Sequence, residues 1–171
     1  MEEEKNLLNE IAAEGYDASD RPFDFVESDT ETALVCEPDG AVREKIGSAL
    51  KNMGYQITEA ANARDALKTM RFHLFDLIAL NETFDLSESG KSDVLAYLET
   101  LSMSTRRQIF VALVTDKHRS MDNMAAFNKS VNVVINLKNI EDVEAILRRA
   151  VSENTAFYRV FKDTLKKLGK I

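Results

Sequence analysis

The chain has 171 residues, a length that suits one domain with a sizeable core plus some decoration. Its 22 basic and 29 acidic residues give a net charge of -7, which argues against a nucleic-acid-binding surface because such surfaces are basic. A single cysteine, Cys36, excludes an internal disulfide framework and fits a reducing compartment. No apolar run approaches the roughly 20 residues of a membrane span, and the acidic start lacks a signal-peptide core, so we expect a cytoplasmic protein.

The first 31 residues are expected to form a short helix and a linker. Residues 1–14 predict the helix, and Gly15 ends it. One side of this helix would carry Leu7, Leu8 and Ile11. The following residues are rich in Asp and Ser and include Pro22, a composition typical of a linker. Candidate anchors onto a neighbouring surface are Phe23, Phe25 and Val26.

From Thr32 onward, predicted strands and helices alternate. The strands are short, mostly apolar runs, which indicates burial on both faces of a sheet. They are expected at 32–36, 55–60, 75–80, 109–114 and 131–137. The helices show apolar residues at a spacing of three and four. They are expected at 41–53, 61–70, 92–101, 119–128 and 140–168.

This alternation predicts an α/β fold with a doubly wound, five-stranded parallel sheet, an N-terminal extension and an elongated C-terminal helix. Right-handed crossovers leave the flavodoxin-like strand order 2-1-3-4-5 as the simplest arrangement. In such sheets the functional crevice lies at the carboxyl ends of the strands. The residues expected there are Glu37, Asn81, Thr115 and Lys138.

In order and spacing, these four residues resemble the active corner of a response-regulator receiver domain. The resemblance covers residues 32–152 and leaves 153–171 as a helical extension. Active receivers hold a divalent cation with two adjacent acids after the first strand. The first of these acids matches Glu37, but the second falls on Pro38, which has no side-chain donor, and Asp39 is displaced by one residue.

The resemblance also implies that the chain lacks the phosphoryl acceptor. That position carries Asn81, and an amide is a poor nucleophile compared with a carboxylate. The hydroxyl of Thr115 and the amine of Lys138 match the family's phosphoryl-binding residues. Further departures are Asp116 after the threonine, Asn139 after the lysine, and Ile135 at the aromatic switch position. The resemblance therefore implies a degenerate pseudo-receiver with no catalytic residue, no metal and no cofactor.

Several roles stay open for the residues of this corner. Lys138 can bond the Asn81 amide and pair with Glu37, hold an anion, or simply be exposed. Thr115 can satisfy a backbone group at the end of its strand. Glu82 is expected to be a solvated loop residue, with cation binding or charge mimicry as the alternatives.

The predicted C-terminal helix is longer than one five-stranded domain needs. Residues 140–168 would span roughly 43 Å at 1.5 Å per residue. Its last turns carry an apolar stripe, which should bury against something. The residues of that stripe are Phe157, Val160, Phe161, Leu165 and Leu168. The candidate partners are the N-terminal segment, a second subunit and another protein.

These observations favour a non-phosphorylatable protein-interaction module in bacterial two-component-type signalling, and not an enzyme. It would dock on a protein partner or form a homodimer through the fourth and fifth βα units and the long helix. One alternative is an atypical phosphoryl-accepting regulator that uses Glu37, Asp39 or Glu82. Another is a small-ligand or anion sensor at the strand-end pocket.

Overall fold

A computed structural model describes residues 7–15 and 30–170. They form a five-stranded parallel sheet with the order β2-β1-β3-β4-β5, which confirms the predicted fold and strand order. The strands are β1 (Thr32–Cys36), β2 (Gln56–Glu59), β3 (Leu77–Asn81), β4 (Phe110–Thr115) and β5 (Val133–Asn136). Every residue of β1, β3 and β4 is buried, as their continuous apolar runs predict.

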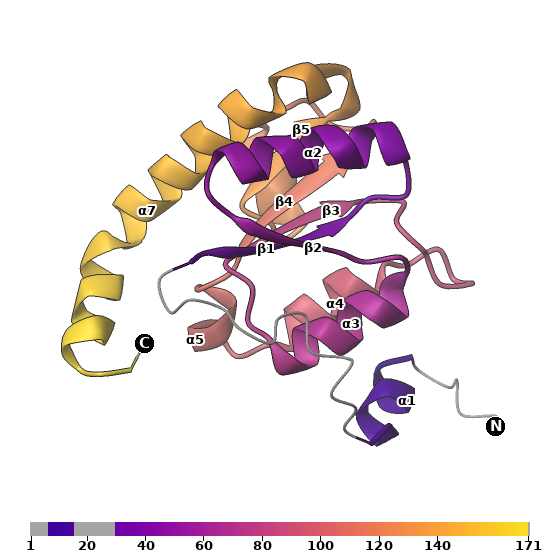
Figure 1. The fold of residues 1–171 in the computed structure, drawn as a ribbon, viewed down its shortest axis with the longest axis horizontal. Coiled ribbons are helices and arrows are strands. Elements are labelled where there is room, and N and C mark those ends of the chain that lie inside the picture. Colours follow the sequence, from indigo (N-terminus) through magenta and orange to yellow (C-terminus); the bar gives the residue numbers. More distant parts are fainter. Residues whose placement is uncertain (1–6, 16–29, 171) are drawn as a thin grey trace.

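Helices cover both faces of the sheet (Figure 1). The helices are α1 (Leu7–Ala13), α2 (Gly40–Asn52), α3 (Ala63–Phe72), α4 (Asp93–Thr100), α5 (Met103–Arg106), α6 (Asn123–Asn128) and α7 (Val143–Lys167). Helices α2 and α7 pack on one face through side chains such as Leu50 and Leu147. Helices α3, α4 and α6 pack on the other face, and α1 lies outside α3 and α4. Alternate strand residues therefore serve two separate apolar cores.

The last helix begins later than the sequence predicts. Strand β5 ends at Asn136, and a 3-10 segment, η2 (Leu137–Asp142), follows it. Asn136 caps η2 by accepting a hydrogen bond from the backbone N–H of Lys138 at 2.9 Å. Within η2 the backbone of Asn139 departs from helical geometry. Helix α7 then runs for 25 residues, or roughly 38 Å, and extends past the edge of the sheet (Figure 1).

Two other helices also differ from the prediction. Helix α6 has six residues because Asp122 caps it, accepting from the N–H groups of Met124 and Ala125. Just before this cap, Met121 adopts a left-handed conformation with φ of 61°, which breaks the helix predicted from residue 119. The short helix α5 was not predicted, and it follows a Ser102 cap.

Helix α1 lies within the helix predicted over residues 1–14. The predicted linker anchors, Phe23, Phe25 and Val26, lie outside the described residues. Across the described part of the chain, no helix is long and apolar enough to cross a membrane.

Candidate functional site

The sheet register brings the predicted residues to one corner. Cys36 pairs with Leu80, so Glu37 and Asn81, the next residue of each segment, lie side by side. Thr115 ends the neighbouring strand. Glu37, Asn81 and Thr115 are only 1%, 6% and 2% exposed, although all three are polar. Such burial requires hydrogen-bond partners, and each of these side chains has them.

Asn81 and Glu37 form the centre of this corner. Asn81 Nδ2 donates to both carboxylate oxygens of Glu37, at 3.0 and 2.8 Å. Asn81 Oδ1 accepts from the backbone N–H of Thr83 at 2.8 Å and from its hydroxyl at 2.9 Å. Both ends of the amide are therefore occupied by groups of the chain itself, which fixes the amide in one orientation.

The Glu37 carboxylate is shielded from solvent at the end of β1. Burial raises its pKa, while hydrogen bonds from Asn81 and the Asp39 N–H oppose that rise. The Asp39 N–H donates to Glu37 Oε1 at 3.1 Å. Arg43 does not reach the carboxylate; its guanidinium donates to the Glu37 carbonyl at 3.0 Å. The carboxylate is thus stabilised by neutral donors within hydrogen-bond distance.

Glu82, expected to be a solvated loop residue, instead joins the corner. Its backbone N–H bonds the Val114 carbonyl at 2.8 Å, which extends the β3–β4 ladder and places its side chain beside Thr115. Its carboxylate accepts from the Thr115 hydroxyl at 2.6 Å and from Lys129 Nζ at 2.8 Å. Lys117 Nζ lies 3.6 Å from Glu82 Oε2. The Glu82 side chain is only 11% exposed.

The surroundings of Glu82 favour its charged form strongly. Burial alone would raise its pKa, but the hydrogen bonds from Lys129 and Thr115 and the charges of Lys129 and Lys117 lower the pKa to about 2. Thr115 also accepts from the N–H of Lys117 at 3.1 Å, so its hydroxyl is used on both sides. The corner therefore already contains an anion held by a hydroxyl and an ammonium group.

The structure does not bring Lys138 into this cluster. Lys138 is exposed and lies in η2, two residues beyond the end of β5. Its backbone N–H bonds Asn136, and within the described residues its amine forms no hydrogen bond or ion pair. Of the roles left open for Lys138, the structure shows exposure. Lys129, from the C-terminal end of α6, supplies the cation instead.

The remaining predicted positions are also accounted for. Pro38 is exposed, and the Asp39 side chain caps α2 by accepting from two backbone N–H groups. Ile135 is 1% exposed and packs in the core beneath α2 and α7. Asp116 is exposed, and Asn139 accepts a hydrogen bond from Ser120 at 2.8 Å.

The residues at this corner do not fit a divalent cation. Mg²⁺ needs several oxygen ligands in an octahedral array. Glu37 faces the amide nitrogen of Asn81, Pro38 offers no donor, and Asp39 is engaged by the helix cap. Over the ranges that the structure describes, no group of three or more His, Cys, Asp or Glu side chains could hold a metal ion.

Sequence reasoning missed Lys129 and misjudged Glu82. A signal for Glu82 exists, because an acid directly after a buried strand must lie at the strand's carboxyl end. No local signal marks Lys129, which is 47 residues further along the chain and reaches the site through the packing of α6.

Comparisons with known proteins address the fold. No protein-family model matches the sequence, and no curated protein matches it either. Among solved structures, the chemotaxis response regulator CheY4 of Vibrio cholerae is 16% identical, with a TM-score of 0.55, covering 71% of this chain and 98% of that one. A CheY-like receiver domain protein from Methanospirillum hungatei is 19% identical, with a TM-score of 0.55, covering 74% and 98%.

The fold is that of a response-regulator receiver domain. A third similar structure, the Mn²⁺-bound form of response regulator Rcp1, is 19% identical, with a TM-score of 0.53, covering 68% of this chain and 91% of that one. At these identities the similarity establishes the receiver fold and nothing about activity. Function must therefore be argued from the corner and from the surface of the molecule.

Proposed function

We propose that this chain is a non-phosphorylatable, receiver-like interaction module, and not an enzyme, that acts in bacterial two-component-type signalling. The hydrogen-bonded pair of Asn81 and Glu37 carries the proposal. It replaces the nucleophilic carboxylate with an amide and engages the first acid of the corner. The receiver fold then provides surfaces for binding without the chemistry of a switch.

The three acids considered as alternative phosphoryl acceptors all have partners within the chain. Glu37 binds Asn81, Asp39 caps α2, and Glu82 is held by Thr115 and Lys129. A nucleophilic attack by any of them would first have to break these interactions. We therefore do not favour the phosphoryl-accepting alternative.

Incubation of the full chain with acetyl phosphate and Mg²⁺, followed by intact-mass spectrometry, tests this part of the proposal. The expected result is no increase in mass with acetyl phosphate and no binding of beryllium fluoride, an analogue of the phosphoryl group. A stable phosphoryl adduct that disappears in an Asn81→Ala or Thr115→Ala variant would refute it. An adduct that persists in both variants but disappears in Glu37→Gln, Asp39→Asn or Glu82→Gln would establish an atypical acceptor.

The surface evidence for an interaction role lies on α7. Phe157, Val160 and Leu168 are 80%, 73% and 64% exposed, which is unusual for large apolar residues on one helix. Phe161 and Leu165 are half-buried, and the guanidinium of Arg107 lies 6.0 Å from the Phe161 ring centroid. This apolar stripe at the end of α7 supports an interface, and we propose that it mediates homodimerisation.

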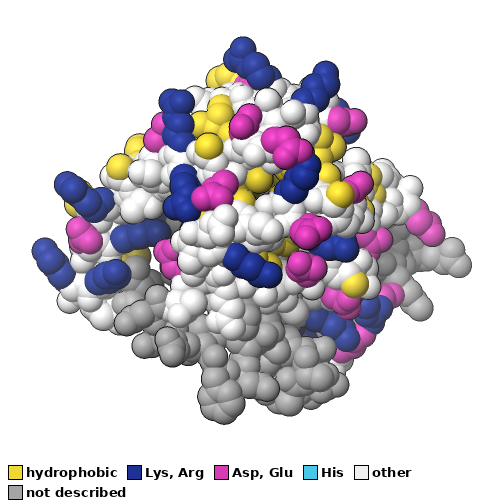
Figure 2. All heavy atoms as spheres, turned by 45° about the horizontal axis from the view of Figure 1, so that its top comes forward, with side chains coloured by type: hydrophobic (Ala, Val, Ile, Leu, Met, Phe, Trp, Pro, Cys, Tyr) yellow, Lys and Arg dark blue, Asp and Glu magenta, His cyan; other side chains and the backbone are white. Residues whose placement is uncertain are grey.

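The end of α7 is also basic, and Figure 2 shows a group of Lys and Arg side chains where this helix ends, at the left of the view. Elsewhere on the same face, acidic and basic side chains are interspersed (Figure 2). Such mixing differs from the continuous basic field that binds nucleic acid. The proposal therefore favours a protein partner over nucleic acid.

Light scattering of the full chain and of a version truncated after Ser152 tests the α7 interface. We expect a dimer for the full chain and a monomer for the truncated chain. A full-length Phe157→Ser/Val160→Ser variant should also be monomeric, while Leu86→Ser, at a 40% exposed position between β3 and α4, should remain a dimer. A monomeric wild-type chain would overturn the homodimer.

A further inference from the structure

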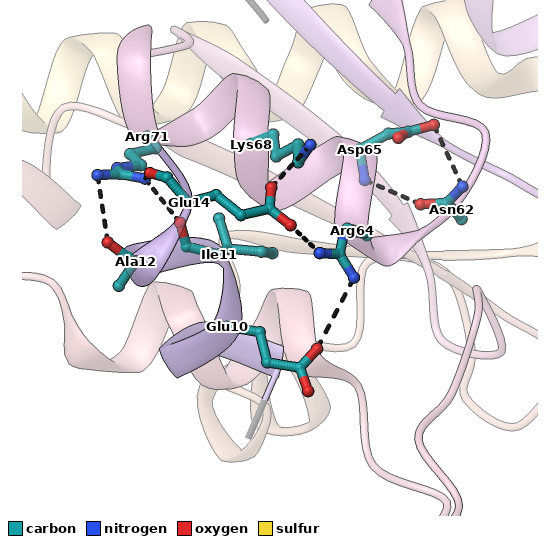
Figure 3. Close-up of polar contacts among 9 residues, drawn as sticks. All are labelled: Glu10, Ile11, Ala12, Glu14, Asn62, Arg64, Asp65, Lys68 and Arg71. Atoms are coloured by element: carbon teal, nitrogen blue, oxygen red, sulfur yellow. Dashed lines mark hydrogen bonds and ion pairs between the residues drawn. The ribbon is translucent and has the colours of Figure 1, made fainter. Parts of the chain in front are cut away.

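Helix α1 packs against the outer surface of α3 and α4 (Figures 1 and 3). Ile11 is 4% exposed, and Leu7, one turn earlier on the same side, packs against the apolar core of that face. No other large side chain of α1 is fully buried among the described residues. The apolar part of this contact is therefore small and confined to one stripe.

Charge complementarity defines the rest of the contact. Along α3, Arg64, Lys68 and Arg71 recur at intervals of four and three, so they share one helix face. Glu10 on α1 and Glu14, the residue directly after α1, are also four residues apart and meet this face (Figure 3). Arg64 pairs with both acids, at 3.7 Å from Glu10, and Lys68 Nζ lies 2.8 Å from Glu14.

The Arg71 side chain binds backbone carbonyl groups at the C-terminal end of α1. Its guanidinium donates to the carbonyl of Ile11 at 2.6 Å and to that of Glu14 at 3.2 Å (Figure 3). The last carbonyl groups of any helix lack intrahelical partners, so this contact suits a helix end whatever its side chains are. The surface on α3 thus combines cations for acidic side chains with a donor for a helix C-terminus.

Helix α1 can leave the α3–α4 surface without unfolding of the rest of the protein. A seven-residue helix is far shorter than the roughly 12–15 residues that an isolated helix needs, so α1 depends on its docking site. Its ion pairs involve side chains that are 26–42% exposed, where salt weakens them. Residues 16–29 lie between α1 and the rest of the chain. Docked and undocked states of α1 should therefore exchange without unfolding the sheet.

We propose that the α3–α4 surface is a binding site for an acidic amphipathic helix of a partner protein, and that α1 is its intramolecular occupant. The fitting helix carries aliphatic residues at i and i+4, acidic residues at i+3 and i+7, and ends near Arg71. Leu7, Ile11 and Glu10 of α1, with Glu14 directly after it, show this pattern. Helix α1 blocks the site until a partner helix displaces it. This inference does not depend on whether the corner at Asn81 takes up a phosphoryl group.

A peptide with the sequence of residues 1–15, fluorescently labelled, is the probe. Its binding is measured by anisotropy with the full chain and with a full-length Ile11→Asp variant, whose own helix no longer docks. A tethered helix competes at an effective concentration on the order of a millimolar. We therefore expect the peptide to bind the variant at least about tenfold more tightly than wild type, and less tightly as salt is added.

A matched pair of charge reversals locates the binding. In the Ile11→Asp background, Arg71→Glu should abolish peptide binding, whereas Arg159→Glu, at an exposed position on α7, should not change it. Equal affinity for wild type and Ile11→Asp, or peptide binding that survives Arg71→Glu, would overturn the proposal. Circular dichroism checks that each variant is folded, and Glu14→Arg replaces Ile11→Asp if that variant does not fold.

Hydrogen exchange of the wild-type chain gives an independent test. The α1 amides should exchange much faster than those of α3 and should lose protection as salt is added. Equal protection in the two helices would show that α1 does not open separately and would overturn the proposal.

The oligomeric state of the Ile11→Asp variant tests whether the occupant comes from a second copy of this chain. If the wild-type chain is a dimer and Ile11→Asp makes it monomeric, the surface binds α1 of a second copy. That result would overturn the proposal of a separate partner protein.

Discussion

Asn81 Nδ2 lies 2.8 and 3.0 Å from the two carboxylate oxygens of Glu37, inside a corner from which solvent is almost excluded. The Asn81 amide therefore has a structural role in addition to lacking the nucleophilic oxygen of a carboxylate. An amide can donate to a buried carboxylate, whereas a second carboxylate at the same distance would repel it. Asn81 and Glu37 therefore form a stable pair that an Asp at position 81 would break.

We predict that Asn81→Asp destabilises the protein by about 3–5 kcal/mol at pH 7, the scale expected for a buried charge that loses its partner. One carboxyl of the new pair would have its folded-state pKa raised above its unfolded value. The penalty should therefore be largest at neutral pH, should shrink as the pH falls through that raised pKa, and should be nearly absent by about pH 4, the ordinary pKa of a carboxyl group. Urea denaturation at pH 7 and pH 4 measures it.

Asn123→Asp is the matched control, because it adds the same charge at an exposed position. It should change the unfolding free energy by less than about 0.5 kcal/mol. Millimolar Mg²⁺ should not restore Asn81→Asp, because Pro38 supplies no second acid. Full recovery with Mg²⁺ would show that the corner still accommodates a cation.

The sheet and its strand order were predictable because apolar runs of five or six residues leave few alternatives to buried parallel strands. The pairing of Glu37 with Asn81 follows from that register. The position of Lys138 was not predictable, because a cap by Asn136 ends β5 two residues before Lys138 and turns the chain into η2. Lys129 enters through tertiary packing alone, which leaves no periodic signal in the sequence.

A second prediction concerns the pH dependence contributed by Glu82. Its pKa falls from an ordinary value of 4.5 to about 2 in the folded protein. A lowered folded-state pKa contributes stability that is present above the unfolded pKa and is lost as the pH falls through the folded pKa. The Glu82 contribution should thus be complete above pH 4.5 and disappear towards pH 2. A shift of this size corresponds to about 3 kcal/mol.

Glu82→Gln should remove most of this pH-dependent contribution, so the difference in stability between wild type and variant should narrow between pH 4.5 and pH 2.5. Thermal or urea unfolding across that range measures it. The control is Glu88→Gln in the exposed loop, which should follow the wild-type curve. If the stability of Glu82→Gln and of wild type depended on pH in the same way, ionised Glu82 would not contribute to the stability of the folded protein.

A third prediction separates the two lysines. Lys129→Met removes the cation 2.8 Å from Glu82 and should lower the unfolding free energy by roughly 1 kcal/mol at pH 7, since the Lys129 side chain is 39% exposed. Lys138→Met should change it by less than about 0.5 kcal/mol because its amine is exposed. Urea denaturation of both variants at low and high salt compares them. A larger loss of unfolding free energy for Lys138→Met than for Lys129→Met would show that Lys138, and not Lys129, stabilises the corner.

The last prediction uses Cys36 as a reporter of global opening. Its side chain is fully buried in the interior strand β1, and burial raises the pKa of the thiol far above its ordinary value. Only a thiolate reacts readily, so alkylation by iodoacetamide requires the sheet to open. The labelling rate should therefore rise with urea in parallel with the loss of the circular dichroism signal. Ile11→Asp, which undocks α1 alone, should leave the labelling rate in the absence of urea unchanged. Rapid labelling of the native chain would show that β1 opens locally, and the sheet core would then be less cooperative than its packing indicates.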